Sequence, residues 1–414
     1  MKKTICLLLA VVMVIGLMAG CGSSGSSSAP ASSGSNSAPA APASSGSEAA
    51  PADAGSESSA PAAFKVGGTG PLTGGAAIYG NAAMNGAQIA VDEINEAMGY
   101  EFFQLRYEDD AHDAEKAVNA YNALKDWGMQ LSLGSVTSAP CNATSAETFA
   151  DRIFALTPSA SAPTVIAGKD NMFQMCFLDF PTQGGASAQY IKNMWPDSKV
   201  GIIWKNDEDY STGLRNSFVE TSGELNLEIV AEQTFTEGNA DFSVQLTALQ
   251  NAGADLVFLP MYYQPASLIF AQASAMGYAP KWFGVDGMDG ILTMEGFDPA
   301  MAEGVMLLTP FNSDSDDPAT VSFVSKYQQL FGETPNQFAA DGYDCIYAYK
   351  QALDAAGATP DMSASELCDL MIAQFTSMTF NGLTGTDMTW DASGAVSKGA
   401  HGCVIQNGAY IGLD

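Results

Sequence analysis

Three segments rich in hydroxyl-bearing and small residues follow predicted strands in the first half of the chain. They run from Gly68 to Gly80, from Ser135 to Pro140 and from Thr157 to Pro163. The second segment also opens a predicted helix. Hydroxyls and backbone N–H groups near helix N-termini bind anions, including carboxylates, because these N–H groups lack partners within the helix. The first half of the chain therefore predicts a carboxylate-binding site at the ends of its strands.

The second half of the chain offers aromatic and acidic side chains at equivalent positions. Tyr210 follows one predicted strand, Tyr262 and Tyr263 follow another, and Asp286 follows a third. These residues supply aromatic walls and an acid that can face an ammonium group. A buried zwitterion needs partners for both of its charges. A carboxylate-binding site in one half and an acid in the other half therefore predict a site for an amino acid.

Strand-like and helix-like segments alternate along the chain from Phe64 onward. Predicted strands cover residues 64–66, 102–107, 131–134, 153–156, 199–204, 227–233, 255–259 and 282–285. Predicted helices with apolar residues at helical spacing lie at 83–94, 114–127, 213–222, 242–249 and 266–276. Such alternation is typical of parallel sheets covered by helices, with ligands outside the carboxyl ends of the strands. We therefore predict an α/β protein with two Rossmann-like lobes and a ligand cleft between them.

The rest of the folded part divides into a mainly helical stretch, residues 317–375, and short strands and turns from residue 379. We predict that the first lobe consists of residues 64–180 and 309–378. The second lobe then consists of residues 181–308 and 379–414.

The N-terminal segment predicts where the protein acts. Two lysines precede an apolar run from Ile5 to Leu17, and small residues lead to Cys21. This pattern predicts a signal peptide over residues 1–20, since the run is too short for a membrane span. The cysteine resembles the lipidated residue of bacterial lipoproteins, although an ordinary secreted protein is the alternative. Residues 21–63 have almost no large apolar side chains and predict a disordered tether.

Charge and composition exclude several function classes. The chain has 16 basic and 46 acidic residues, and an acidic surface repels nucleic acid and anionic lipid headgroups. The glycine-rich run from Gly67 to Gly75 lacks the order of a nucleotide-binding loop. No GxSxG motif is present, and His112 and His401 lie far apart in the sequence. We therefore predict no nucleic-acid partner, no catalytic residue and no cofactor.

Five cysteines lie beyond the signal peptide and Cys21, and none of them forms a CxxC motif. They are predicted to be small core residues, with their pairing left open, and no metal site is expected. These cysteines are Cys141, Cys176, Cys345, Cys368 and Cys403.

Several motifs resemble those of the branched-chain amino-acid-binding proteins. The motifs are Gly70-Pro71-Leu72-Thr73-Gly74, Tyr79-Gly80, Asp92-Glu93-Ile94-Asn95, the segment from Thr157 to Pro163, and Tyr210-Ser211-Thr212-Gly213. That family consists of type I periplasmic binding proteins, which capture substrates for ABC importers. The resemblance implies two lobes joined by three hinge crossovers, which close over a small molecule. It also implies a monomer that delivers its ligand to permease and ATPase subunits, lipid-anchored outside the cytoplasmic membrane.

The resemblance also implies roles for individual residues. Serines and a neighbouring alanine of the first lobe hold the ligand's carboxylate and amino groups, and tyrosines from both lobes lie near the ligand. These residues are Tyr79, Ser138, Ser159, Ala160, Ser161, Tyr210 and Tyr262. Asp286 stands where the family has a longer glutamate that meets the ammonium group. The shorter side chain of Asp286 indicates either a different ligand or a gap that a water molecule fills.

The chain departs from the family at one pair of positions, and several plainer interpretations remain open. The family's disulfide positions carry His112 and Thr137, so no bridge is expected there. In the plainer interpretations, Tyr79 and Tyr210 are aromatic residues packed in the core, and the serines are turn residues. Asp286 then caps a turn. The acidic run from Asp207 to Asp209 is predicted to be solvated at a helix start. Alternative functions are a ligand-sensing module of the same fold and a binder of another small carboxylate or amide.

Overall fold

The computed structural model describes residues 62–178 and 182–413. The predicted signal peptide, Cys21 and the tether to residue 61 lie outside the described residues. Within the described part, no helix has both the length and the apolar character needed to cross a membrane.

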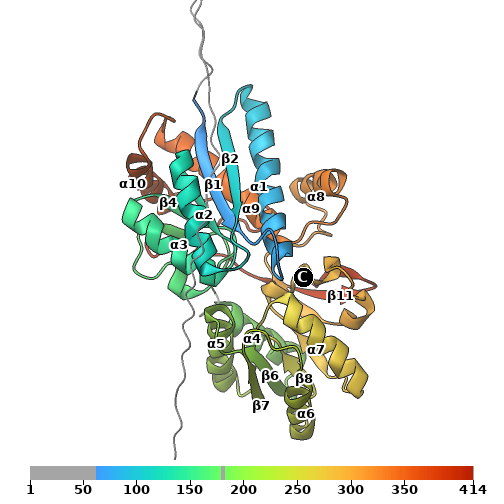
Figure 1. Cartoon of the computed structure of the whole chain (residues 1–414). Coiled ribbons are helices and arrows are strands. Elements are labelled where there is room, and N and C mark those ends of the chain that lie inside the picture. Colours follow the sequence, from blue (N-terminus) through green and yellow to red (C-terminus); the bar gives the residue numbers. More distant parts are fainter. Residues whose placement is uncertain (1–61, 179–181, 414) are drawn as a thin grey trace, which may run out of the picture. The chain divides into compact units, whose positions relative to one another are not determined.

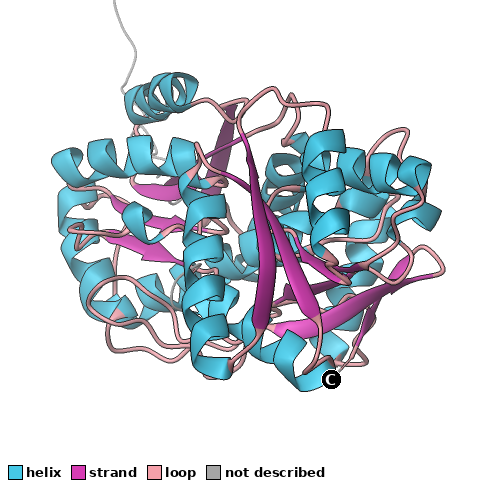
Figure 2. Cartoon of the chain, turned by 90° about the horizontal axis from the view of Figure 1, so that it is seen from below, coloured by secondary structure: helices cyan, strands magenta, loops and turns pink. Residues whose placement is uncertain are grey.

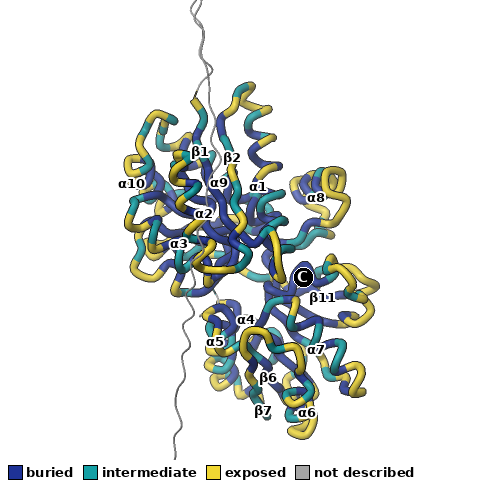
Figure 3. Tube along the Cα trace, in the orientation of Figure 1, coloured by how far each residue is buried: buried dark blue, intermediate teal, exposed yellow. Residues whose placement is uncertain are grey.

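The first sheet is entirely parallel and has the strand order β2-β1-β3-β4-β5. Its strands are β1 Phe64–Gly70, β2 Phe103–Asp109, β3 Leu131–Ser135, β4 Phe154–Thr157 and β5 Met172–Gln174. The connecting helices are α1 Ala77–Met98, α2 Ala114–Trp127 and α3 Ser138–Asp151. Strand β1 is almost wholly buried (Figure 3). Strand β3 is wholly buried, as expected for a sheet with helices on both faces. The sequence predicted each of these elements except β5.

The second sheet has seven strands in the order β12-β11-β10-β9-β8-β6-β7. They are β6 Lys199–Lys205, β7 Glu228–Phe235, β8 Leu256–Phe258, β9 Lys281–Phe283, β10 Met306–Thr309, β11 His401–Gln406 and β12 Ala409–Gly412. Its helices are α4 Gly184–Met194, α5 Asp209–Leu225, α6 Ser243–Ala252 and α7 Tyr263–Met276 (Figures 1 and 2).

The last two strands of this sheet depart from the predicted parallel arrangement. Strand β11 is antiparallel to both β10 and β12. Asn407 and Gly408 have φ angles of 52° and 73° in the turn between β11 and β12. Positive φ at both central residues is the requirement of a tight hairpin turn, which Asn-Gly satisfies well. The chain therefore returns on itself instead of crossing over through a helix.

The chain passes three times between the parts of the molecule built on the two sheets, as the resemblance implied. The passages follow β5, β10 and the last of three helices that lie between β10 and β11 in the chain. These helices are α8 Pro318–Phe331, α9 Gln337–Ala356 and α10 Ala364–Phe375. Helices α1 and α9 approach closely, because a Cβ at Gly86 would overlap the carbonyl oxygen of Ala339. Tyr349 of α9 donates a hydrogen bond to Ser132 O in β3 at 2.6 Å.

A buried lysine connects the first and third of these passages with helix α9. Lys398 Nζ lies 2.7 Å from Asp341 Oδ1, and the two side chains are 0% and 2% exposed. The same ammonium donates to Thr384 Oγ1 at 2.5 Å and to Met175 O at 2.9 Å. Burial raises the pKa of Asp341 to about 6, although Lys398 opposes the shift. We refer to Lys398, Asp341, Thr384 and Met175 as the crossover cluster.

The cysteines of the described part lie in the core, as predicted. Cys141, Cys345, Cys368 and Cys403 are buried thiols. Burial raises the pKa of the Cys141 thiol to about 12, which keeps it protonated and unreactive at neutral pH.

Candidate functional site

Asp286 lies in a buried pocket of hydrogen-bond donors at the end of β9. It begins the short helix η3, Asp286–Met288, and the residue is 4% exposed. Its Oδ1 accepts hydrogen bonds from Tyr210 Oη at 2.6 Å and from the Gly287 N–H at 2.8 Å. Burial raises the pKa of Asp286, and the hydrogen bonds from Tyr210 and Gly287 oppose that shift. The sequence therefore places an acid at this strand end, and the fold removes it from water.

Four aromatic side chains surround this acid. The Tyr210 and Tyr262 rings stack with centroids 4.6 Å apart and an interplanar angle of 8°. The Tyr79 ring, from the first lobe, lies 5.4 Å from that of Tyr262 and 5.0 Å from that of Tyr263. Tyr79 Oη donates to Gly287 O and accepts from the Tyr263 N–H. The structure thus brings Tyr79, Tyr210, Tyr262 and Asp286 together, with Tyr263 also in contact.

The predicted serines lie at the ends of β3 and β4, and two of them bind backbone groups. Ser138 begins α3, and its Oγ accepts a hydrogen bond from the Ala162 N–H at 3.2 Å. Ser159 Oγ donates to Val136 O at 2.6 Å. These bonds hold the two strand ends to each other. Ser161 differs, because its Oγ is buried and has no hydrogen-bond partner in the described part of the chain.

Ala160 lies between these serines and is fully buried. Its N–H donates to Thr157 Oγ1 at 3.0 Å, and its carbonyl oxygen accepts from Gln174 Nε2 at 2.7 Å. The backbone of the segment after β4 is therefore held by the side chains of Thr157 and Gln174.

The serine segment and the Tyr210 segment are neighbours, although no hydrogen bond between described residues joins a predicted serine to Asp286. Asp209 Oδ2, next to Tyr210, accepts from Asn142 Nδ2 at 3.0 Å and from Thr164 Oγ1 at 3.3 Å. Asn142 belongs to α3 and Thr164 to the short helix η1, Pro163–Val165. The contacts place the N-terminus of α5 against the segments that carry Ser138 and Ser161.

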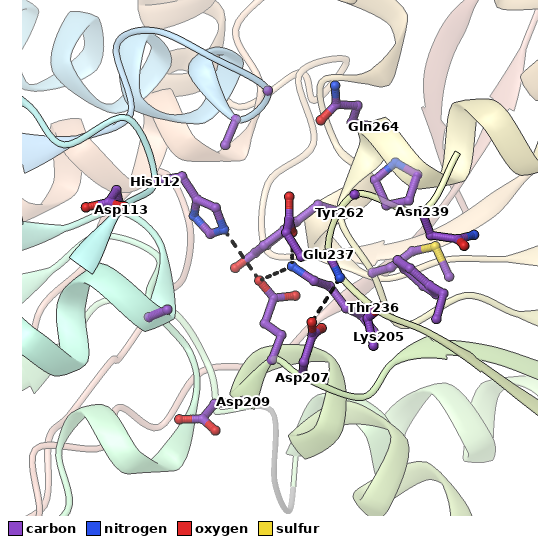
Figure 4. Close-up of a pocket in the computed structure, with 18 of the residues that line it drawn as sticks. His112, Asp113, Lys205, Asp207, Asp209, Thr236, Glu237, Asn239, Tyr262 and Gln264 are labelled. Atoms are coloured by element: carbon purple, nitrogen blue, oxygen red, sulfur yellow. Dashed lines mark hydrogen bonds and ion pairs between the residues drawn. The ribbon is translucent and has the colours of Figure 1, made fainter. Parts of the chain in front are cut away.

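A cavity of about 980 Å³ opens beside the tyrosine cluster (Figure 4). His112 and Asn142 line it from the first lobe, and Lys205, Glu237 and Tyr262 line it from the second. Tyr262 belongs to the predicted site, whereas the predicted serines and Asp286 do not line this cavity. The buried cluster and the cavity therefore share one aromatic wall.

His112 connects the lobes at this cavity. Its Nδ1 lies 2.8 Å from Thr137 Oγ1, so the two residues at the family's disulfide positions form a hydrogen bond here. Its Nε2 lies 3.5 Å from Glu208 Oε1 in the second lobe. The imidazole ring also meets the Tyr262 ring edge-on at 5.6 Å. The acidic run was expected to be solvated, but its central residue, Glu208, is buried because His112 and Lys205 flank it.

Sequence reasoning missed Gln183, which lies directly before α4. The residue is 1% exposed, and neither polar atom of its side chain has a hydrogen bond of ordinary geometry within the described residues. Its amide nevertheless acts on Asp286, since it lowers the pKa of that carboxyl against the effect of burial. No local pattern marks this residue, because its relation to Asp286 spans about a hundred positions of the sequence.

The family model described as periplasmic binding protein matches residues 63–405, which is most of the chain. The chain belongs to this family. This periplasmic binding protein is 28% identical over 312 residues to Leu/Ile/Val-binding protein homolog 3 of Brucella melitensis, covering 74% of the chain and 83% of that relative. The family consists of solute-binding proteins that act outside the cytoplasm.

Solved structures give the same result for the fold of this periplasmic binding protein. A branched-chain amino acid transporter substrate-binding protein of Streptococcus pneumoniae, in complex with isoleucine, superposes with a TM-score of 0.75 at 26% identity, covering 85% of this chain and all of that one. A solute-binding protein of R. palustris in complex with benzoate has a TM-score of 0.76 at 18% identity, covering 85% of this chain and 96% of that one. The predicted two-lobed α/β fold is therefore confirmed.

Proposed function

We propose that this protein captures an amino acid, branched-chain or similar, between two closing lobes and delivers it to the permease of an ABC transporter. The observation that carries the proposal is the buried carboxyl of Asp286, held by Tyr210 and surrounded by rings from both lobes. A buried acid is costly unless it is paired. An ammonium group supplies the missing charge.

The first lobe supports the other end of the same ligand. Ser161 Oγ is buried without a hydrogen-bond partner among the described residues, and the start of α3 lies close by through the bond between Ser138 Oγ and the Ala162 N–H. A hydroxyl and the N–H groups of a helix N-terminus suit a carboxylate. A ligand with both charges then needs both lobes, so that closure and binding depend on each other.

Isothermal titration of the purified protein against the twenty amino acids tests this function. We expect binding heat with leucine, isoleucine or valine, or with an amino acid of similar size. The absence of heat with every amino acid would remove the proposed ligand class.

A small aromatic carboxylate is the second candidate ligand. The stacked Tyr210 and Tyr262 rings favour a flat ligand, and the R. palustris neighbour is a benzoate complex. Benzoate and 4-hydroxybenzoate therefore belong in the same titration. Binding heat with these acids and none with amino acids would identify a small aromatic carboxylate as the ligand.

A sensing role for the same fold is the remaining alternative to transport. Transport predicts that deletion of the protein abolishes uptake of the radiolabelled ligand by cells. Unchanged uptake together with a lost transcriptional or behavioural response to the ligand would support sensing.

We further propose that Cys21 carries the lipid, that residues 21–63 form the tether, and that the protein acts as a monomer at the outer face of the membrane. The lobes then comprise residues 64–180 with 309–378, and 181–308 with 379–414. Mass spectrometry of the N-terminal peptide tests the anchor. Cys21→Ala should release the protein from the membrane fraction.

A further inference from the structure

The cavity beside the tyrosine cluster borders the candidate site on both lobes. Ala139, next to Ser138 in the first turn of α3, lines it from the first lobe, and Tyr262 lines it from the second. Its volume of about 980 Å³ lies at the upper end of the range of about 300–1,000 Å³ that is usual for small-molecule sites. A single branched-chain amino acid occupies only part of such a volume. The side chain of a longer ligand can therefore extend into the cavity.

Glu208 directs a buried carboxylate toward this cavity. The residue directly precedes α5, but its side chain makes no capping hydrogen bond to that helix. Its Oε1 lies instead 3.5 Å from His112 Nε2 and 3.8 Å from Lys205 Nζ, two groups that point into the cavity from opposite lobes (Figure 4). The side chain is 4% exposed, and Oε2 has no hydrogen-bond partner among the described residues. One oxygen of this carboxylate is therefore left to accept from a ligand.

Asn142 offers a second unused acceptor to the same cavity, from the other lobe. Its Nδ2 donates to Asp209 Oδ2 and to Thr164 Oγ1, each at 3.0 Å. Because a carboxylate only accepts hydrogen bonds, the contact with Asp209 fixes the orientation of the amide. The amide oxygen Oδ1 is then buried without a hydrogen-bond partner in the described part of the chain. Native proteins rarely leave such atoms unpaired, so the two lobes together indicate a ligand that donates hydrogen bonds.

The charge of the cavity indicates that this donor is a cation. The described lining includes two lysines, Lys116 and Lys205, and five carboxylates. Lys205 Nζ also donates to Glu237 Oε2 at 2.5 Å, so that its charge is shared between Glu237 and Glu208. A cleft lined by an excess of one sign of charge concentrates ligands of the opposite sign. The five carboxylates are those of Asp113, Asp207, Glu208, Asp209 and Glu237.

We propose that this cavity binds the cationic side chain of an amino acid such as lysine, with Glu208 as the countercharge and Asn142 Oδ1 as an additional acceptor. This inference rests on the proposed function and deepens it, because it specifies the side chain of the captured amino acid. The α-amino and carboxylate groups of the ligand then lie at Asp286 and Ser161, and its distal ammonium lies beyond Tyr262. An ammonium group has three donors, which suits a site with unused acceptors on both lobes.

The test compares lysine with norleucine, which has the same carbon chain and lacks only the distal ammonium. We expect calorimetric titration of the wild-type protein to show lysine binding about ten- to a hundredfold more tightly, as hydrogen bonds to a charged group imply. Glu208→Gln keeps the size of the side chain and removes its charge. This substitution should raise the dissociation constant of lysine about tenfold or more, and that of norleucine less than about twofold.

Controls separate recognition of the ammonium from a general effect of charge or folding. Glu220→Gln removes the same charge from an exposed position of α5 outside the cavity lining, and should leave both dissociation constants unchanged. If Glu208→Gln does not fold, as judged by circular dichroism, Glu208→Asp withdraws the carboxylate by one methylene and should show the same selective loss.

Two results would overturn the inference alone. One is wild-type protein that binds lysine no more tightly than norleucine, while it still binds another amino acid. The other is a preference for lysine that survives unchanged in Glu208→Gln. Wild-type protein that binds no amino acid would overturn the proposed function as well.

Discussion

The two sides of the candidate site are built from different interactions. On the first-lobe side, the hydroxyls of Ser138 and Ser159 bond to backbone groups, and the strand ends hold one another in place. On the second-lobe side, Tyr210 and Tyr262 stack, and Tyr210 bonds to the Asp286 carboxyl. The first side is therefore set by the course of the main chain, whereas the second depends on side chains.

The two sides also differ in charge. The serine side uses neutral hydroxyls and backbone N–H groups, which remain the same over the usual range of pH. The other side contains an acid whose burial raises its pKa. We therefore expect the first side to tolerate single substitutions and the second to respond strongly to both mutation and pH.

The largest expected effect comes from a substitution outside both sides, in the crossover cluster. Lys398→Met removes the cation of the crossover cluster and leaves Asp341 buried without its partner. Breaking a buried pair in this way costs about 3–5 kcal/mol of folding free energy. Chemical denaturation should show a lower midpoint with an unchanged slope.

An exposed lysine provides the matched control for this substitution. Lys125 pairs with Asp151 at 2.5 Å, and its side chain is 45% exposed. Lys125→Met should cost less than about 1 kcal/mol, since solvent screens such pairs. Equal effects of the two substitutions would show that the crossover cluster has no special importance.

Asp286→Asn tests the charged side directly. Removal of the countercharge should weaken amino-acid binding by about 2–4 kcal/mol, because the ammonium then lies in a buried site without a compensating charge. Titration calorimetry measures the loss, and circular dichroism verifies the fold. An unchanged dissociation constant would exclude Asp286 from the site.

The pH dependence of binding sharpens the contrast between the sides. Because burial raises the pKa of Asp286 in the free protein, this acid takes up a proton at a higher pH than an ordinary aspartate. A bound ammonium favours the ionised form, so binding releases that proton. Affinity should therefore fall as the pH drops below the free-protein pKa, by at most about tenfold per pH unit. Asp286→Asn should remove this dependence, and a persisting slope would assign it to another group.

The same shift has the opposite consequence for the stability of the free protein. A carboxyl with a raised pKa in the folded state favours folding at a pH below its unfolded value of about 3.9. That contribution is lost as the pH rises through the folded-state pKa. Thermal unfolding without ligand should therefore show Asp286→Asn gaining stability relative to the wild type as the pH increases.

The smallest effects are expected on the serine side. Ser161→Ala should weaken binding by about 1–2 kcal/mol, because the ligand then loses a hydroxyl that bonds to no other described residue. Ser159→Ala should leave affinity almost unchanged and reduce folding stability by about 1 kcal/mol, since its hydroxyl bonds to Val136 O. A calorimetric titration in which Ser159→Ala weakens binding more than Ser161→Ala would contradict the proposed roles of the two hydroxyls.

Local patterns in the sequence account for most of the individual elements. The helix predicted over residues 114–127 has those bounds, because Asp113 caps its start and Gly128 ends it in a left-handed conformation. Tyr210 and Asp286 could also be identified locally, since each follows a strand, and strand ends converge at one edge of a parallel sheet. Their direct bond was not predictable from either segment alone.

By itself, the sequence determined the alternation of strands and helices, the acidic surface and the residue types at the strand ends, because these depend on neighbours within a few positions. Only the tertiary structure decided that β11 pairs antiparallel with β10 and β12 in the second sheet, that Lys398 is buried against Asp341, and that Tyr210 bonds to Asp286. The physical reason is that burial and pairing arise between segments far apart in the chain. A polar side chain gains its importance only when the fold removes it from water and limits its partners.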